Sequence, residues 1–216
     1  MRGSRRRTTV ILAAFVAVGA VMVLPARSPM GPLLGKVASD VDLLTNMLKH
    51  TEPEAVAQAI AAGVGAQVTL RVGGKTDDRH GPPLTLTGYV RLIADGRFAN
   101  RGPMYTGIEA DMGRTVVFVV GEVEVILTEQ RIQPYDCQAL RCVGIEPRER
   151  LLIGLKSAVH FRADFGPLAQ AIFEVDTPGV HNPDVTRLRF TRLRRPIWPL
   201  DETDRPDWGG AGAGGA

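Results

Sequence analysis

The middle of the chain consists of short stretches in which apolar and polar residues alternate. Such alternation is typical of β-strands that bury one face, and it predicts strands over 67–72 and 84–93. Two apolar stretches, 115–120 and 123–127, flank a Gly-Glu dipeptide and predict a hairpin. Consecutive strands joined by short turns pair antiparallel, so the sheet is expected to be antiparallel or mixed.

Further elements are predicted by turn residues and by short apolar runs. Asp95-Gly96 is a strong hairpin signal directly after the second strand. The apolar run 151–155 fits a buried strand, and 166–171 fits one or two helical turns before another strand at 171–175. Glu122 and Glu124 alternate along one strand and are expected on a solvated face.

Two N-terminal helices are expected before these strands, over about 40–49 and 51–62. Thr51 and Glu54 have capping-box spacing, Pro53 suits a first turn, and two glycines follow the second helix closely. Helices followed by hairpin-connected strands indicate an α+β fold with a mixed or antiparallel sheet, rather than a doubly wound parallel sheet.

Residues 1–31 are set apart by composition. The basic stretch Arg2 to Arg7 precedes an uninterrupted apolar run, Val10 to Leu24, which is the pattern of a signal peptide or signal anchor. The run is shorter than the roughly 20 residues that a membrane-spanning helix needs. The alternative is translated, non-native sequence in front of a truncated reading frame. The first interpretation predicts an exported or membrane-anchored protein, with membrane contact through the apolar run, and the second predicts a cytoplasmic one.

The other end of the chain is basic and then rich in glycine and alanine. Residues 206–216 are expected to be disordered, which leaves 32–205 as the folded domain. The formal net charge is +3, and the alternating stretch 187–195 is expected to place arginines on one solvated face of a strand. Phe190 is the sole aromatic residue in that stretch, so no nucleic-acid partner is expected.

The two cysteines, Cys137 and Cys142, lack the second pair that a structural zinc site requires. Free thiols in a loop or short helix are the favoured interpretation. A disulfide stays open as the alternative if the segment is exported.

The residues by themselves do not form a self-contained catalytic constellation. None of the four histidines, at positions 50, 80, 160 and 181, lies in an H-E-x-x-H or H-x-H motif. His160 precedes Asp164 by four residues, and His181 precedes Asp184 by three, but such pairs are common by chance. The polar loop from Asn100 to Tyr105 has side chains that can bind a carboxylate or a carbonyl group.

Several stretches, in order, resemble the C-terminal domain of the microcystinase C (MlrC) family of zinc metallopeptidases. They are EPEAVAQAIAAGVGA (52–66), VTLRVGGK (68–75), DGRFANRGPMYTG (95–107), GRTVVF (113–118), KSAVHFRADFGP (156–167) and RLRRPIWPLD (192–201). The chain is expected to join the family pattern at about Gly35.

The resemblance implies a two-domain enzyme that hydrolyses linearised microcystin and related small peptides. In such enzymes an Asp and two His of the N-terminal domain hold the zinc, so no metal ligand and no cofactor is expected in this chain. Loops near the domain junction are expected to bind substrate. The candidate substrate-binding residues are Asn100, Arg101, Tyr105, Lys156, Ser157 and His160.

The expected function is therefore the substrate-side domain of a zinc metallopeptidase, inactive alone, with a separate zinc domain and a small peptide as its partners. The first alternative is a non-enzymatic binding module, exported or tethered to a membrane, that reuses this domain. The second is a gene remnant without a stable product.

Overall fold

The computed structural model describes residues 10–13, 20–25, 52–73, 75, 82–157, 159–175, 186 and 189–201, with only the backbone of the first two segments. The chain divides into a body, residues 1–181, and a second unit, residues 182–216.

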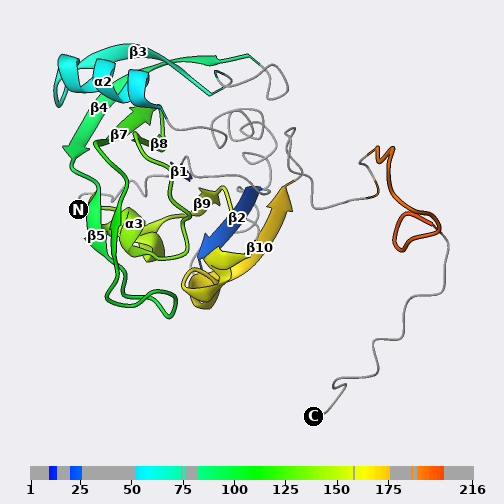
Figure 1. Ribbon diagram of the computed structural model, residues 1–216. Helices are drawn as coiled ribbons and strands as arrows, with labels where there is room; N and C mark the ends of the chain where they lie inside the picture. Colours follow the sequence, from blue (N-terminus) through cyan, green and yellow to red (C-terminus); the bar gives the residue numbers. More distant parts are fainter. Residues whose placement is uncertain are drawn as a thin grey trace. The chain divides into compact units, whose positions relative to one another are not determined.

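The body is built on a mixed, eight-stranded sheet with the order β10-β2-β9-β1-β8-β7-β4-β3 (Figure 1). Strand β1 runs parallel to both of its neighbours, β8 and β9, and every other pair in this sheet is antiparallel. The strands are β1 (Val10–Ala13), β2 (Ala20–Pro25), β3 (Gln67–Val72), β4 (Leu84–Ala94), β7 (Thr115–Val120), β8 (Val123–Thr128), β9 (Leu152–Leu155) and β10 (Ala169–Val175). The predicted α+β class with a mixed sheet is confirmed.

The hairpin β7–β8 is confirmed, and its turn uses Gly121 at a φ of +58°, a conformation that glycine adopts without strain. The strands predicted at 67–72, 151–155 and 171–175 are also present, with boundaries that move by two residues at most. The predicted helical turn before the last strand is a short 3-10 helix, η3 (Gly166–Leu168). Two more 3-10 helices are η1 (Pro147–Glu149) and η2 (His160–Ala163).

The hairpin predicted at Asp95-Gly96 is wrong. Strand β4 pairs with β7 instead, and the chain leaves the large sheet to form a separate ribbon of β5 (Arg97–Ala99) and β6 (Glu109–Asp111). A Cβ on Gly96 would lie 2.2 Å from the main-chain oxygen of Gly113. Glycine at this turn therefore allows the chain to pack closely against Gly113, and the Asp-Gly dipeptide alone does not indicate this contact.

Helix α2 (Pro53–Ala62) is the second of the two helices predicted before the strands, and it ends at Gly63 as expected. The first predicted helix, 40–49, lies outside the described residues, and α3 (Gln138–Arg141) lies between β8 and β9. The described residues thus show one helix before β3, not a pair. Helix α2 has no side-chain cap, because the buried carboxylate of Glu52 binds Gly73 and Lys75 instead.

The apolar run of the first 31 residues contains β1 and β2, two strands inside the large sheet (Figure 1). An extended conformation here differs from the apolar helix of a signal peptide or membrane anchor. A strand with neighbours on both sides in a covered sheet reads as a continuous apolar run, so periodicity cannot separate it from such a helix. Within the described segments no helix is long and apolar enough to cross a membrane.

The core has two parts, one on each face of the sheet. Helix α2 packs through Ala55, Val56 and Ala59 against one face, with Val116 and Phe118 of β7. On the other side, α3 and the 3-10 helices η2 and η3 join a second cluster. That cluster includes Val117, Ile126, Leu140, Ile153, Phe161 and Phe165. Strand β7 therefore contributes alternate residues to both parts of the core.

Glu124 in β8 is buried, so its predicted solvated position is wrong, whereas Glu122 is exposed as expected. One carboxylate oxygen of Glu124 lies 3.1 Å from Arg91 Nη1, and the other lies 3.3 Å from Arg150 Nη2. Two guanidinium groups offset the cost of burying this charge, because a buried carboxylate without partners would be strongly destabilising. Alternation alone does not show that arginines from β4 and from the segment before β9 approach it.

In the second unit, 189–201 contains no strand, so the predicted strand in the arginine-rich stretch is not observed within that range. Arg189, Arg192 and Arg194 are exposed. Asp201 pairs with Arg195 and accepts a hydrogen bond from the main-chain N–H of Ile197 at 2.6 Å. The tail 206–216 lies outside the described residues.

We predict that Gly88→Ala destabilises the body. A Cβ at Gly88 in β4 would lie 2.2 Å from the main-chain oxygen of Val119, which cannot move without disturbing β7. The free energy of unfolding, measured by urea denaturation, should fall by about 1–3 kcal/mol. Gly166→Ala is the matched control, because its Cβ would meet only Arg162 Cβ at 3.9 Å, and it should change stability little. Equal stability of the two variants would contradict the packing described for β4.

Candidate functional site

A buried carboxylate, Asp136, ties together two segments of the body. Its Oδ2 accepts hydrogen bonds from the main-chain N–H groups of Arg101 and Gly102, each at 2.7 Å. Its Oδ1 accepts one from the N–H of Gln138 at 2.8 Å, at the start of α3. Asp136 is 1% exposed, so these bonds are shielded from water. It holds the loop 100–107 against the segment that leads into α3.

A second carboxylate, Asp164, joins the segment after η2 to the start of α3, beside Asp136. Its Oδ2 accepts a hydrogen bond from the main-chain N–H of Cys137 at 2.7 Å. A Cβ on Gly102 would lie 2.8 Å from Asp164 Cγ, so the glycine permits the loop to pack directly against this side chain. Of the pair noted in the sequence, Asp164 binds the backbone of Cys137 and His160 is exposed.

Asn100 shapes the loop 100–107 from inside. Its main-chain N–H and its Nδ2 both donate to the main-chain oxygen of Ile108, at 3.0 and 2.7 Å. Its main-chain oxygen accepts a hydrogen bond from the N–H of Gly107 at 2.8 Å. The residue is 1% exposed, and its Oδ1 has no hydrogen-bond partner in the described part of the chain. Asn100 therefore closes the loop and retains one unused acceptor.

The outer surface of this loop carries an aromatic pair. Tyr105 is 59% exposed, adopts a φ of +56°, and places its ring centroid 5.3 Å from that of Tyr135, tilted by 45°. Burial raises the pKa of Tyr135; Tyr105 and Asp136 add to the increase, and a hydrogen bond with Asn100 opposes it. Arg101, in the same loop as Tyr105, is also exposed. The loop therefore presents a guanidinium and a phenol ring to solvent.

The six predicted substrate-binding residues separate into two groups. Arg101, Tyr105 and His160 are exposed. Asn100, Lys156 and Ser157 are buried, and Ser157 Oγ has no hydrogen-bond partner among the described residues. Asn100, Arg101 and Tyr105 share one loop, and the packing of Gly102 on Asp164 brings the segment of His160 to that loop. Lys156 and Ser157 follow β9 directly.

Sequence reasoning missed Asp136 and Tyr135, and it noted Asp164 only as a neighbour of His160. Asp136 lies directly before Cys137, the N-cap of α3, and its Oδ1 accepts a hydrogen bond from the N–H two residues further on, as Asp commonly does in turns. An Asp in such a turn before a short helix could have identified it. No local signal links Asp164 to Cys137, because their contact spans 27 positions.

Both cysteines are free and flank α3, which confirms the favoured interpretation. Burial, together with the charge of Asp164, raises the pKa of the Cys137 thiol far above its ordinary value. Burial also raises the pKa of Cys142 to about 11. Both thiols are therefore protonated at neutral pH and are poor nucleophiles or metal ligands.

The described residues contain no group of three His, Cys, Asp or Glu side chains that could hold a metal ion. His160 belongs to the part that was searched, whereas His50, His80 and His181 lie outside it.

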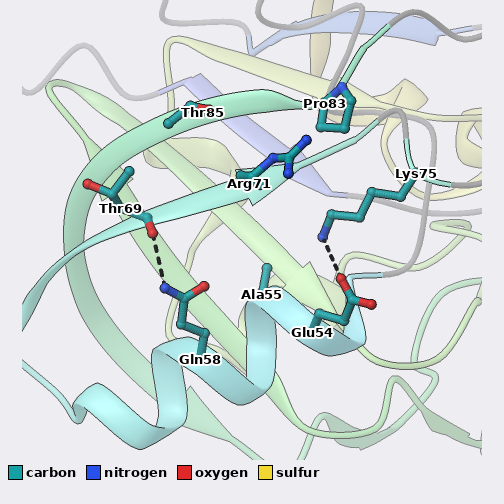
Figure 2. Close-up of a pocket in the computed structure, with 8 residues that line it drawn as sticks. All are labelled: Glu54, Ala55, Gln58, Thr69, Arg71, Lys75, Pro83 and Thr85. Atoms are coloured by element: carbon teal, nitrogen blue, oxygen red, sulfur yellow. Dashed lines mark hydrogen bonds and ion pairs between the residues drawn. The ribbon is translucent and has the colours of Figure 1, made fainter.

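A separate pocket of about 700 Å³ lies between α2 and the strands β3 and β4 (Figure 2). Figure 2 shows Gln58 of α2 donating to the main-chain oxygen of Thr69, at 3.1 Å, and Lys75 beside Glu54, at 3.7 Å. Arg71 extends from β3 into the same space. No sequence motif marks this pocket, because its wall combines segments of α2, β3 and β4 that are ordinary by themselves.

The chain belongs to the MlrC C-terminal family, because the family model described as MlrC C-terminus matches residues 3–192. It is 27% identical over 169 residues to microcystinase C from a Sphingomonas species, covering 78% of this chain and 32% of that protein. It also resembles the crystal structure of a suggested metallopeptidase from Mesorhizobium sp. BNC1, with a TM-score of 0.64 and 28% identity. That match covers 94% of this chain and 40% of the other.

The family match corrects the expectation that the pattern begins at about Gly35. It begins at residue 3 and includes the apolar run that contributes β1 and β2. The chain spans about a third of the length of the curated relative and two fifths of the solved structure.

We predict that Asp136→Ala loosens the loop 100–107. The substitution leaves three main-chain N–H groups without their shared acceptor, and the free energy of unfolding should fall by about 2–4 kcal/mol. Hydrogen exchange of the amides of Arg101, Gly102 and Gln138 should accelerate more than exchange in β7. Asp95→Ala is the control, because its single bond to the N–H of Arg97 is exposed. Unchanged exchange at all three amides would contradict the proposed role of Asp136 in holding the loop.

We also predict that stability falls above pH 8.5. Both folded thiols have a raised pKa, whereas an unfolded thiol titrates near a pKa of about 8.5. Above that pH the unfolded chain loses thiol protons that the folded chain retains. The contribution of the thiols to the free energy of unfolding, present in full at lower pH, is therefore lost as the pH rises towards 11. The slope from the two thiols is at most about 1.4 kcal/mol per thiol and pH unit. Urea denaturation between pH 8 and 10.5 measures it, and the double variant Cys137→Ala, Cys142→Ala should show a flatter slope.

Proposed function

We propose that this chain is the substrate-side part of an MlrC-like zinc metallopeptidase and that it contacts a small peptide substrate through the loop 100–107. The observation that carries the proposal is the anchoring of this loop by two carboxylates, Asp136 and Asp164, in a chain of the MlrC C-terminal family. The names of the two relatives, a microcystinase and a suggested metallopeptidase, support a peptide as the substrate.

The exposed side chains of this region suit a peptide ligand. The guanidinium of Arg101 can donate paired hydrogen bonds to a carboxylate or a carbonyl group. The ring of Tyr105 offers an apolar face and a hydroxyl group, and it loses little conformational freedom on binding. His160 supplies a further donor or acceptor from the adjoining segment. Because the loop backbone is already ordered by Asp136, binding would not need to order it.

The buried candidates have a different role in this proposal. Asn100 holds the loop closed through Ile108, so it positions Arg101 and Tyr105 rather than contacting the peptide. Lys156 and Ser157 are buried after β9 and lead into the segment of His160. We assign all three to positioning.

The zinc in this proposal is held by residues outside the described part of the chain, in a separate domain of the enzyme. A zinc ion bound there would polarise the scissile carbonyl and activate a water molecule. The described residues do not fit the ion themselves. Their contribution is to bind and orient the peptide next to that centre.

We predict that the purified 216-residue chain alone neither binds zinc at one equivalent nor hydrolyses peptides. Zinc content is measured by atomic emission after dialysis, and hydrolysis by chromatography of a linear peptide. Stoichiometric zinc together with peptide hydrolysis would contradict the assignment of this chain to the substrate side.

A chimera tests the positive part of the proposal. In it, this chain replaces the matching third of the Sphingomonas microcystinase C, whose remaining part supplies the zinc centre. We expect hydrolysis of a linear peptide, and we expect Arg101→Ala and Tyr105→Ala each to raise KM about tenfold or more with zinc content unchanged. Arg131→Ala, at an exposed arginine outside the loop, is the matched control. If both loop variants keep the KM of the parent chimera, the loop is not the substrate-contacting surface.

A further inference from the structure

The pocket between α2 and β3 lies outside the loop 100–107 and plays no part in the proposed function. Its volume of about 700 Å³ falls within the range of about 300–1,000 Å³ that is usual for ligand sites. The wall combines charged and hydroxyl-bearing side chains with the apolar surfaces of Ala55 and Pro83 (Figure 2). Such a mixed wall suits a ligand that carries both a charge and an apolar part.

Arg71 is exposed and is the second basic residue, besides Lys75, in the wall of this pocket. Lys75 forms ion pairs with the two nearby acidic residues. Its Nζ lies 2.8 Å from Glu52 Oε2 and 3.7 Å from Glu54 Oε2. Arg71 itself forms no ion pair or hydrogen bond through its side chain with the residues that the structure describes. A guanidinium without a partner among the described residues is suited to bind a carboxylate in a bidentate manner.

The main chain of β3 offers a second set of contacts. Strand β3 is the last strand of the large sheet, and its register with β4 is unbroken. The main-chain oxygen of Thr69 accepts from Gln58 of α2, so it faces the outer edge. Main-chain groups alternate in direction along an antiparallel strand, and the N–H and C=O of Arg71 therefore face the same edge. Thr85, opposite Arg71 in the register, adds a hydroxyl group to the pocket.

We propose that this pocket binds an acidic peptide segment in an extended conformation. The main chain of the peptide pairs with the edge of β3 at Arg71, and one carboxylate accepts hydrogen bonds from the Arg71 guanidinium and the Thr85 hydroxyl. Addition of a strand to a sheet edge gives affinity through main-chain bonds, and a side-chain pocket gives specificity. Glu54 at the rim disfavours a second carboxylate, so the ligand has one acidic residue between neutral ones.

The test uses the 216-residue chain without zinc, so its result is independent of peptide hydrolysis. Calorimetric titration compares acetyl-Thr-Val-Glu-Val-Thr-amide with the analogue that has Gln in place of Glu. The Glu peptide should bind about tenfold or more tightly than the Gln peptide, as expected for a charge-assisted pair. Arg71→Gln should abolish this preference and leave the affinity for the Gln peptide unchanged. Arg131→Gln, at an exposed arginine away from the pocket, should keep the preference.

Three outcomes would overturn the proposal. The first is equal affinity of the parent chain for the two peptides. The second is a preference for Glu that survives Arg71→Gln in a variant whose thermal unfolding matches the parent. The third is binding of free glutarate as tightly as the Glu peptide, which would indicate a carboxylate site without strand pairing.

Discussion

The hairpin β7–β8 is the structural feature on which the rest of the body depends, because its side chains are buried on both faces of the sheet. Val116 and Phe118 pack under α2, while Val117 and Ile126 pack under α3, η2 and η3. Neither half of the core could form without the hairpin, since each half uses alternate residues of the same strands. The burial of apolar surface here is the main favourable term for both layers.

The same hairpin determines where the candidate site lies. The ribbon β5–β6, with the loop 100–107 at its end, precedes β7, and the segment with Asp136 follows β8. The two strands thereby bring both segments back to one side of the sheet, where Asp136 binds the loop through main-chain N–H groups. The carboxylates of this region stabilise backbone geometry and leave Arg101 and Tyr105 exposed, as the proposed contact with a peptide requires. This division between buried anchors and exposed contacts is what a preorganised binding loop requires.

Sequence patterns predicted β3, β4, β7, β8, β9 and β10, one hairpin and α2, because each depends on neighbours in the chain, whereas the short strands β5 and β6 were not predicted. The errors share one cause, which is a partner distant in sequence. The apolar run around Val10 to Leu24 supplies strands because β8, β9 and β10 lie beside it. Glu124 is buried because two arginines reach it. Of the six candidate site residues, the sequence placed three in one loop, but it did not indicate which of the six would be exposed.

By itself, the sequence determined the periodicity of the strands, the glycine turn between β7 and β8 and the resemblance to the MlrC family, and it favoured free thiols. The strands and the turn follow from the alternation of side chains and from local sterics, and the resemblance follows from several matching stretches in order. The tertiary structure alone decided the order of the strands, the parallel insertion of β1 between β8 and β9, and the carboxylate ties that hold the loop. Each of these joins residues far apart in the chain, and such pairs become favourable only when the whole core has collapsed and excluded water from them.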